Sequence, residues 1–255
     1  MFVDGQSTGL LLDHGQGQRK RGRVYRKPMY ELYIANKNYS SWSLRAWVLM
    51  RELEIAFQEH LVPFGQESSW QSFRRISPSG KVPCLIDGGI VVWDSLAIAE
   101  YLAERHDVVW PAQAGARAWA RSAAAEMHSG FSELRSRCSM SCGLRIRLNE
   151  FPAALERDVA RLGTLWNEGL RRFGGPFLAG AAFTAVDAFY APVAFRIQTY
   201  GLTLDTAAVA YVDHLLGTRA MREWYAGALK ETLRDQPHDD EVSRIGRVLE
   251  DLRAK

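Results

Sequence analysis

The spacing of hydrophobic residues divides the chain into two parts. From Tyr30 to about residue 108, short apolar or alternating runs typical of strands are interleaved with stretches of helical spacing. They occur in the order strand, helix, strand, short helical turn, two strands and helix, which is typical of a layered α/β domain. The predicted strands are 31–35, 55–63, 82–86 and 90–93, and the predicted helices are 40–53, 70–73 and 94–102.

From Ala114 onward, hydrophobic residues recur at three- and four-residue intervals, as they do on one face of a helix. Thr184 and Asp187 have the spacing of a capping box, which assigns both residues to folding. We therefore predict an α/β domain over residues 29–108 followed by an all-helical domain over residues 114–255. The helices predicted in the second domain are 116–137, 151–173, 184–200 and 206–230.

The stretch from residue 81 to residue 101 combines a hairpin with the start of a helix. Its two apolar runs are joined by Asp87-Gly88-Gly89, and glycine supplies the positive φ that a tight hairpin turn requires. Pro83 has no backbone N–H to donate, and it restricts Val82 before it to an extended conformation. The N–H and C=O of Val82 are therefore free to pair with an extended peptide, as an added strand would.

Asp94 and Ser95 follow the hairpin directly and are residues of the kind that cap helices. The N-terminus of a helix carries a partial positive charge and free backbone N–H groups, which favour a carboxylate. The carboxylate of Asp94 could in turn bind an ammonium group. Together the two residues suit the head group of an α-amino acid, and a plain capping role is the alternative.

The charge of the chain is concentrated near its first residue. Residues 1–28 have a net charge of +4 and the whole chain has a net charge of +3, so the rest of the chain has a net charge of −1. This small negative charge predicts no nucleic-acid-binding surface. This segment is predicted to be a disordered basic extension, with Met29 as an alternative start. No apolar run is long enough to span a bilayer, and three cysteines give no disulfide framework. We expect a cytoplasmic protein that does not bind membranes.

Several short motifs, in this order, resemble those of the cytosolic glutathione S-transferase family. They are a Ser-Ser-x-Ser-x-Arg helix start at residues 40–45, a Ser-Pro-Ser-Gly-Lys-Val-Pro loop at 77–83, the Asp-Ser helix start, and a Phe-Thr-x-x-Asp motif at 183–187. The resemblance covers Tyr30 to about residue 229. The first motif is similar to that of the zeta class, in which a cysteine stands in place of Trp42.

The resemblance implies a thioredoxin-like N-terminal domain, a cis peptide bond before Pro83 and a homodimer. It also implies glutathione as co-substrate, without a metal. Val82 would pair through its backbone with the cysteinyl part of glutathione. Asp94 and Ser95 would hold the γ-glutamyl head group, and Lys81 could reach the glycine carboxylate.

Ser40 falls on the serine that activates the glutathione thiol in the family, and Ser41 beside it could substitute or support it. A capping role is the alternative for Ser40. Lowering a thiol pKa from about 8.5 to roughly 6.5 requires about 2.7 kcal/mol. A hydrogen bond to a charged group supplies roughly 1.5–3 kcal/mol and a helix N-terminus roughly 0.3–1 kcal/mol. One hydroxyl and the helix therefore nearly suffice without a general base.

Three functions fit these residues. The leading prediction is a detoxifying transferase that adds the glutathione thiolate to a small hydrophobic electrophile. The alternatives are a glutathione-dependent cis–trans isomerase similar to maleylacetoacetate isomerase, and a non-catalytic protein for binding or assembly. A glutaredoxin-like reductase is disfavoured because no cysteine lies in the loop before the first helix. The residues expected to line the electrophile pocket are Trp42, Phe64, Met127, Phe131 and Arg135.

Overall fold

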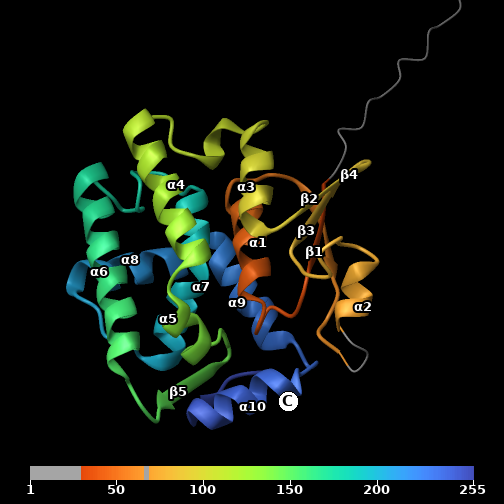
Figure 1. Ribbon diagram of the computed structural model, residues 1–255, viewed down its shortest axis with the longest axis vertical. Helices are drawn as coiled ribbons and strands as arrows, with labels where there is room; N and C mark the ends of the chain where they lie inside the picture. The colour runs from red at the N-terminus through yellow and green to blue at the C-terminus, as the bar shows by residue number, and fades with distance from the viewer. Residues whose placement is uncertain (1–29, 66–68) are drawn as a thin grey trace, which may run out of the picture.

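The computed structural model describes residues 30–65 and 69–255. The predicted fold class is confirmed, because a thioredoxin-like domain with a mixed sheet is followed by a helical domain (Figure 1). The predicted basic extension lies outside the described residues. The predicted domain boundary falls between the short helix η1 (Asp107–Val109) and α4 (Ala114–Ser129), and it stays a prediction. None of the described helices is long and apolar enough to cross a membrane.

Four strands form one sheet in the order β2-β1-β3-β4. β1 (Tyr30–Ile34) runs parallel to β2 (Phe57–Leu61) and antiparallel to β3 (Cys84–Asp87). β3 and β4 (Ile90–Trp93) pair as the predicted hairpin, and Gly88 in its turn has the expected positive φ of +59°. β3 is therefore one of the two central strands, and the segment that leads into it lies in the middle of the domain.

Helices cover both faces of this sheet. α1 (Ser41–Glu52) and α3 (Ser95–Ala103) lie on the face toward the helical domain, and α2 (Ser69–Arg74) lies on the other (Figure 1). The alternation in β1 places Leu32 and Ile34 in the core, where both are fully buried. The starts of α1 and α3, which carry the predicted site residues, thus face the second domain.

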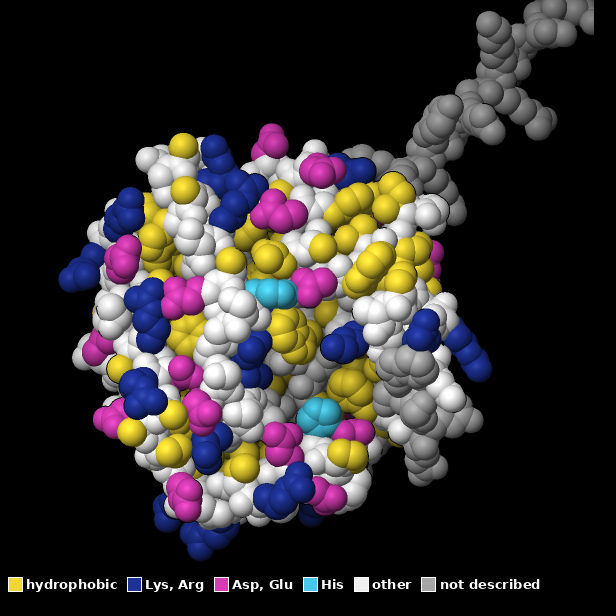
Figure 2. Space-filling view, viewed as in Figure 1, with side chains coloured by type: hydrophobic (Ala, Val, Ile, Leu, Met, Phe, Trp, Pro, Cys, Tyr) yellow, Lys and Arg dark blue, Asp and Glu magenta, His cyan; other side chains and the backbone are white. Residues whose placement is uncertain are grey.

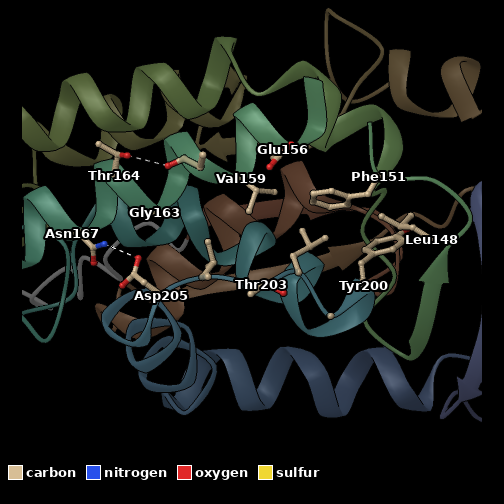
Figure 3. Close-up of a pocket in the computed structure, with 14 residues that line it drawn as sticks. Leu148, Phe151, Glu156, Val159, Gly163, Thr164, Asn167, Tyr200, Thr203 and Asp205 are labelled. Atoms are coloured by element: carbon tan, nitrogen blue, oxygen red, sulfur yellow. Dashed lines mark hydrogen bonds between the residues drawn. The ribbon is translucent and has the colours of Figure 1, made fainter. Parts of the chain in front are cut away.

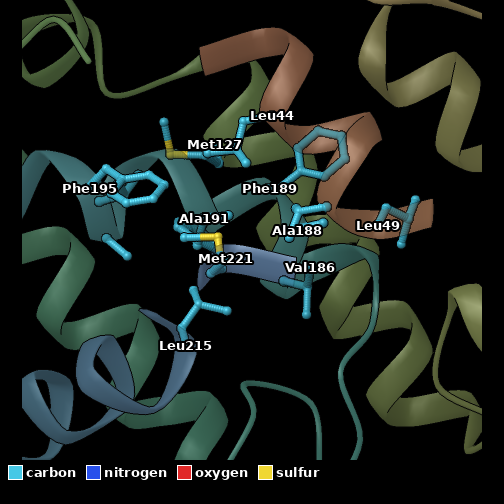
Figure 4. Close-up of a cluster of buried hydrophobic side chains, with 14 of the residues drawn as sticks. Leu44, Leu49, Met127, Val186, Ala188, Phe189, Ala191, Phe195, Leu215 and Met221 are labelled. Atoms are coloured by element: carbon cyan, nitrogen blue, oxygen red, sulfur yellow. The ribbon is translucent and has the colours of Figure 1, made fainter. Parts of the chain in front are cut away.

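α7 (Ala185–Tyr200) is the central helix of the second domain and contacts α1, α4, α8 (Thr206–Leu216) and β5 (Leu144–Leu148). All but one of its residues are buried, as expected of a helix surrounded by others. Figure 4 shows Phe189 and Phe195 on α7 with Leu44 of α1 and Met221 of α9 (Arg219–Lys230) around them. α1 therefore packs in one continuous hydrophobic core with elements of both domains.

The predicted capping box at the start of α7 is present. Oδ2 of Asp187 accepts the N–H of Thr184 at 3.0 Å, and Oδ1 accepts the N–H of Leu178 at 3.0 Å and the hydroxyl of Tyr211 at 3.1 Å. Asp187 is fully buried. These contacts confirm that the pair serves folding.

Two of the helices predicted in the second domain are interrupted. The helix predicted over 116–137 ends at Gly130 and resumes as α5, and the helix predicted over 206–230 ends at Gly217 and resumes as α9. Glycine is common at helix ends because it lacks the side chain that favours helical propagation. The remaining helices of this domain are α5 (Ser132–Arg137), α6 (Ala153–Phe173), α8 (Thr206–Leu216), α9 (Arg219–Lys230) and α10 (Gln236–Ile245).

The prediction of an all-helical second domain missed a two-stranded sheet. β5 (Leu144–Leu148) pairs antiparallel with β6 (Gly246–Asp251), which directly follows α10. The sequence Leu-Arg-Ile-Arg-Leu of β5 alternates with period two, and Leu144 and Ile146 are buried. The ribbon places the residues after β6 next to the first domain, where Arg253 donates to the hydroxyl of Tyr39 at 2.9 Å.

Candidate functional site

The predicted site residues line two adjoining cavities that share Trp42, Lys81 and Val82. The α3 cavity, of about 400 Å³, lies at the start of α3. The α1 cavity, of about 730 Å³, lies between the start of α1, α5 and α10. Figure 2 shows the hollowed face between the sheet and the helical domain, where hydrophobic, basic and histidine side chains gather. Ser40 and Ser41 line the α1 cavity, Pro83, Asp94 and Ser95 line the α3 cavity, and Lys81 and Val82 line both.

The Val82–Pro83 peptide bond is cis, as the family resemblance implied. β3 begins at Cys84, two residues later than predicted, so Val82 and Pro83 lie beyond the end of the strand. Among the described residues, the backbone N–H and C=O of Val82 have no hydrogen-bond partner. An extended peptide in the cavity could therefore pair with them.

Asp94 caps α3 and has an unusual backbone conformation, with φ of +75° and ψ of 133°. Its Oδ1 accepts the N–H of Leu96 at 2.8 Å, while Oδ2 lies 3.5 Å from Nε2 of His128 on α4. Positive φ is costly for a residue other than glycine and often occurs at functional sites. The capping prediction is confirmed, and nearly half of the side chain remains exposed to a ligand.

Ser95 follows at the first turn of α3 and is only 2% exposed. Its Oγ has no hydrogen-bond partner among the described residues, although it is buried. Buried hydroxyl groups are almost always hydrogen-bonded, so one left unpaired in a cavity wall indicates a missing partner. A carboxylate seated at this helix N-terminus would supply that partner.

Ser40 precedes α1, but its side chain makes no capping hydrogen bond. Its Oγ donates instead to Oγ of Ser43 at 2.7 Å, and that oxygen also accepts the N–H of Ala35 at 3.1 Å. A plain capping role for the Ser40 hydroxyl is therefore wrong. The partnership with Ser43 was missed, although the three-residue spacing on one helix face is visible in the sequence.

The loop before Ser40 is held by the helical domain. The carboxylate of Glu231 accepts the N–H of Lys37 at 2.6 Å and the N–H of Asn38 at 3.1 Å. Nε1 of Trp224 donates to the carbonyl oxygen of Lys37 at 2.9 Å. These contacts join the two domains directly behind the serine and fix its position in the cavity wall.

Buried positive charge lies next to the α1 cavity. Arg45 of α1 stacks over Trp42, with its guanidinium carbon 4.3 Å from the ring centre. Burial, together with repulsion from Arg196 and Arg135, lowers the pKa of Arg45 to about 9. Burial likewise lowers the pKa of Arg196 to about 10. Burial also lowers the pKa of His128, whose ring packs edge-on against Trp42 at 5.3 Å.

Three of the five residues expected to line the electrophile pocket do so, namely Trp42, Phe64 and Arg135. Met127 and Phe131 do not, because both are buried in the core. The prediction also missed three residues that reach the cavity from distant helices, namely Arg196 on α7 and His238 and Glu241 on α10. It also missed Tyr39, Phe73 and Met140, which lie outside these two helices.

A separate cavity of about 800 Å³ lies between α6 and the connection from α7 to α8 (Figure 3), and none of the predicted site residues lines it. Nδ2 of Asn167 donates to Oδ2 of Asp205 at 2.6 Å. Oδ1 of Asp205 accepts the N–H groups of Ala207 and Ala208 and so caps α8. These polar side chains thus have structural roles that explain their positions.

Metal-binding groups do not gather at either cavity. Among the described residues, no three His, Cys, Asp or Glu side chains are grouped so as to hold a metal ion. Cys138 and Cys142 are free and buried, and burial raises the pKa of both thiols. The groups that face a ligand are hydroxyls, backbone amides, aromatic rings and charged side chains.

Residues 39–105 match the family model described as the glutathione S-transferase N-terminal domain. These residues form a glutathione S-transferase N-terminal domain. This match confirms the resemblance found in the sequence motifs. The matched segment contains every predicted site residue, from Ser40 to Ser95.

Curated relatives match parts of the chain. A dichloromethane dehalogenase of Methylorubrum extorquens is 40% identical over 60 residues, which are 23% of this chain and 21% of that protein. The chain thus matches about a fifth of the length of that relative. A probable maleylacetoacetate isomerase of Caenorhabditis elegans is 26% identical over 183 residues, 68% of this chain and 81% of that protein.

The fold extends the similarity through the helical domain. A theta class glutathione S-transferase from Xanthomonas axonopodis pv. citri, solved with glutathione bound, superposes with a TM-score of 0.58 at 20% identity. The match covers 81% of this chain and 100% of that chain. At this identity the likeness establishes the glutathione S-transferase fold for both domains.

Proposed function

We propose that the protein is a glutathione transferase that ionises the glutathione thiol for attack on an electrophile. The observation that carries this proposal is that all seven residues predicted from the sequence line two adjoining cavities. The α3 cavity would hold the γ-glutamyl group on Asp94 and Ser95. The free backbone groups of Val82 would pair with the cysteinyl part, and Lys81 would face the glycine carboxylate.

Ser40 would then act on the thiol where the two cavities meet. Its hydroxyl turns from Ser43 and donates to the thiolate, while Ser43 donates its own proton to Ser40 Oγ. The thiol proton passes to water. The sulfur lone pair forms a new S–C bond, and the leaving group departs with the electrons of the bond that breaks. Burial of the sulfur beside the N-terminus of α1 adds to the stabilisation of the thiolate.

A glutathione titration tests the proposal. Calorimetry of the full chain should show binding, and thiolate absorbance followed against pH should show the bound thiol ionised near neutrality. A chain that does not bind glutathione would overturn the proposal and favour the predicted assembly role. If glutathione binds but its thiol is not ionised near neutrality, the protein is a glutathione-binding protein and the proposed catalytic activity is refuted.

We expect Ser95→Ala to weaken glutathione binding about tenfold. The variant removes a hydrogen bond to a charged carboxylate, and such bonds contribute roughly 1.5–3 kcal/mol. Calorimetry measures the change. Ser122→Ala is the matched control, since this exposed serine on α4 bonds only within its own helix. Equal affinities of the Ser95 variant and the control would exclude Ser95 from the glutathione site.

The predicted alternative, a glutathione-dependent cis–trans isomerase, uses the same thiolate and gives a different stoichiometry. An isomerase adds the thiolate reversibly and releases it, so free thiol is not consumed. A transferase consumes one thiol for each electrophile. Titration of free thiol during turnover therefore separates the two.

The same proposal extends to a cytoplasmic homodimer with a role in detoxification. Support for a dimer comes from β4, an edge strand on which Ile90, Val91 and Trp93 are 37–49% exposed. Exposed apolar side chains on an edge strand suit a contact with another chain. Sedimentation equilibrium should give twice the mass of 28.7 kDa, and a mass of one chain would refute the dimer.

A further inference from the structure

Three arginines lie next to the α1 cavity, and two of them, Arg45 and Arg196, are buried. Among the described residues, Arg45, Arg135 and Arg196 form no ion pair with a carboxylate. Unpaired charge away from water is costly, and an arrangement that keeps it indicates an anionic partner. The arginines that do pair with a carboxylate are Arg51, Arg105, Arg121, Arg137, Arg161, Arg172, Arg219 and Arg253.

Arg196 is the most constrained of the three. It lies on α7, is 4% exposed and lines the α1 cavity. Its Nε donates to the carbonyl oxygen of Cys138 at 2.7 Å, which fixes the plane of the guanidinium group. Neither terminal nitrogen has a hydrogen-bond partner among the described residues. The two terminal nitrogens are the pair that binds a carboxylate in a bidentate manner.

Arg135 approaches the same cavity from α5. Its Nη1 donates to the carbonyl oxygen of His128 at 3.0 Å, and its guanidinium carbon lies 5.7 Å from the ring centre of Trp42. Arg45 lies behind Trp42 and adds positive potential without lining the cavity. Lys81 and His238 also line it, and among the described lining residues Glu241 is the acidic one. The balance of charge favours an anion.

The remainder of the cavity is aromatic. Phe64 and Phe73 meet edge to face with their ring centres 6.1 Å apart. His238 packs against Phe64 at 5.3 Å and stacks on Tyr39 at 5.0 Å. Such a wall suits an apolar, ring-sized body. The α1 cavity therefore offers two kinds of surface, an aromatic one and one formed by arginines.

We propose that the electrophile of this site carries an apolar body and one anionic group, such as a carboxylate, which Arg135 and Arg196 bind. The proposal rests on the proposed transferase function and names its substrate class. For an aryl chloride, the thiolate forms an S–C bond, the C–Cl bond breaks, and chloride leaves with the electron pair. The thiol proton goes to water.

A matched pair of electrophiles tests the proposal with the full chain. The pair is 4-chloro-3-nitrobenzoate and 4-chloro-3-nitrobenzamide, which differ in charge and little in shape. Each kcat/KM is divided by the rate constant of the same compound with free glutathione. We expect the ratio for the benzoate to exceed that for the benzamide at least tenfold, as loss of a charge-assisted hydrogen bond would cost.

Variants assign this preference to the arginines. Arg135→Gln should reduce the preference to within about twofold of unity, and Arg135→Lys should keep most of it because the charge remains. Arg137→Gln is the control, since this arginine lies two residues away on α5 and pairs with Glu133. Arg196→Lys tests the second arginine while retaining its charge in the buried position.

The outcomes separate this proposal from the one on which it rests. Turnover of both compounds with equal ratios overturns the anionic substrate and leaves the transferase intact. If neither compound is turned over although glutathione binds, the transferase proposal fails. In that case, the preference is decided by measuring the binding of the benzoate and the benzamide to the glutathione complex by calorimetry. Equal affinities overturn the proposal of an anionic substrate. Tighter binding of the benzoate supports the proposal if Arg135→Gln removes the difference.

Discussion

Ser40→Ala is expected to lower kcat/KM for glutathione conjugation about 100-fold while changing glutathione affinity less than threefold. Its hydroxyl is proposed to supply most of the thiolate stabilisation, roughly 1.5–3 kcal/mol, and each 1.36 kcal/mol is a factor of ten in rate. Binding should persist because the groups that would hold the tripeptide lie in the α3 cavity. Stopped-flow conjugation kinetics and calorimetry on the same preparations measure the two effects.

The pH dependence of the bound thiol makes this prediction specific. In the unmodified protein, the pKa of bound glutathione should lie near 6.5, and in Ser40→Ala it should return toward the ordinary value of about 8.5. Raising the pH should therefore recover part of the lost rate in the variant. A variant that loses rate at every pH while the thiol stays ionised would contradict the role of Ser40.

Two neighbouring serines serve as controls. Ser43→Ala removes the group that accepts from Ser40 at 2.7 Å, so we expect an intermediate loss of rate, about tenfold. Ser41 also lines the α1 cavity but has no hydrogen bond to Ser40 or Ser43 among the described residues. Ser41→Ala should therefore retain at least half of the rate, and a larger loss would favour the predicted catalytic role of Ser41.

The sequence could predict the α3 cavity because its parts are close together in the chain. Val82, Pro83, Asp94 and Ser95 lie within fourteen residues, and a hairpin and a helix cap fix their relative positions. Turn chemistry, capping and the absence of a proline N–H are local effects. Local effects can be inferred without knowing how distant segments pack.

The far wall of the α1 cavity could not be predicted in the same way. Arg196 and His238 reach it from α7 and α10, more than 150 residues after Ser40. Nothing in the spacing near these residues indicates which face of their helix meets another domain. Met127 and Phe131 show the converse error, since helical apolar spacing does not distinguish a core residue from a cavity wall.

The missed strands have a related cause. β5 has a period-two pattern only five residues long, and its partner β6 begins nearly 100 residues later. A short strand is stable only when a partner is present, and pairing across such a distance leaves little signal in either segment. Extending the helical pattern over the whole domain therefore gave the right class and missed the ribbon.

Asp187→Ala is expected to lower the free energy of unfolding by about 3–5 kcal/mol, because each of three buried donors left without a partner costs roughly 1–3 kcal/mol. The change strands the N–H groups of Leu178 and Thr184 and the hydroxyl of Tyr211 in the core. Urea denaturation measures it. Asp205→Ala is the control, because Asp205 caps the exposed start of α8 and its loss should cost about 1 kcal/mol.

The stability gaps of Asp187→Asn and Asp205→Asn, each measured against the unmodified protein, should change with pH in opposite directions. Burial raises the pKa of Asp187 to about 6, above its value in the unfolded chain, so its contribution to stability is greatest at low pH and is lost as the pH rises through 6. The stability gap between the unmodified protein and Asp187→Asn should therefore widen by about 1.4 kcal/mol for each pH unit from about 6 down to about 4, and stay constant below that.

Asp205 provides the contrast. The hydrogen bond from Asn167 lowers the pKa of Asp205, so its contribution is present at neutral pH and is lost as the pH falls. The gap for Asp205→Asn should therefore narrow in acid, while the gap for Asp187→Asn widens. If both gaps narrowed, the carboxylate of Asp187 would be ionised throughout, and its hydrogen bonds would outweigh the cost of burying the charge.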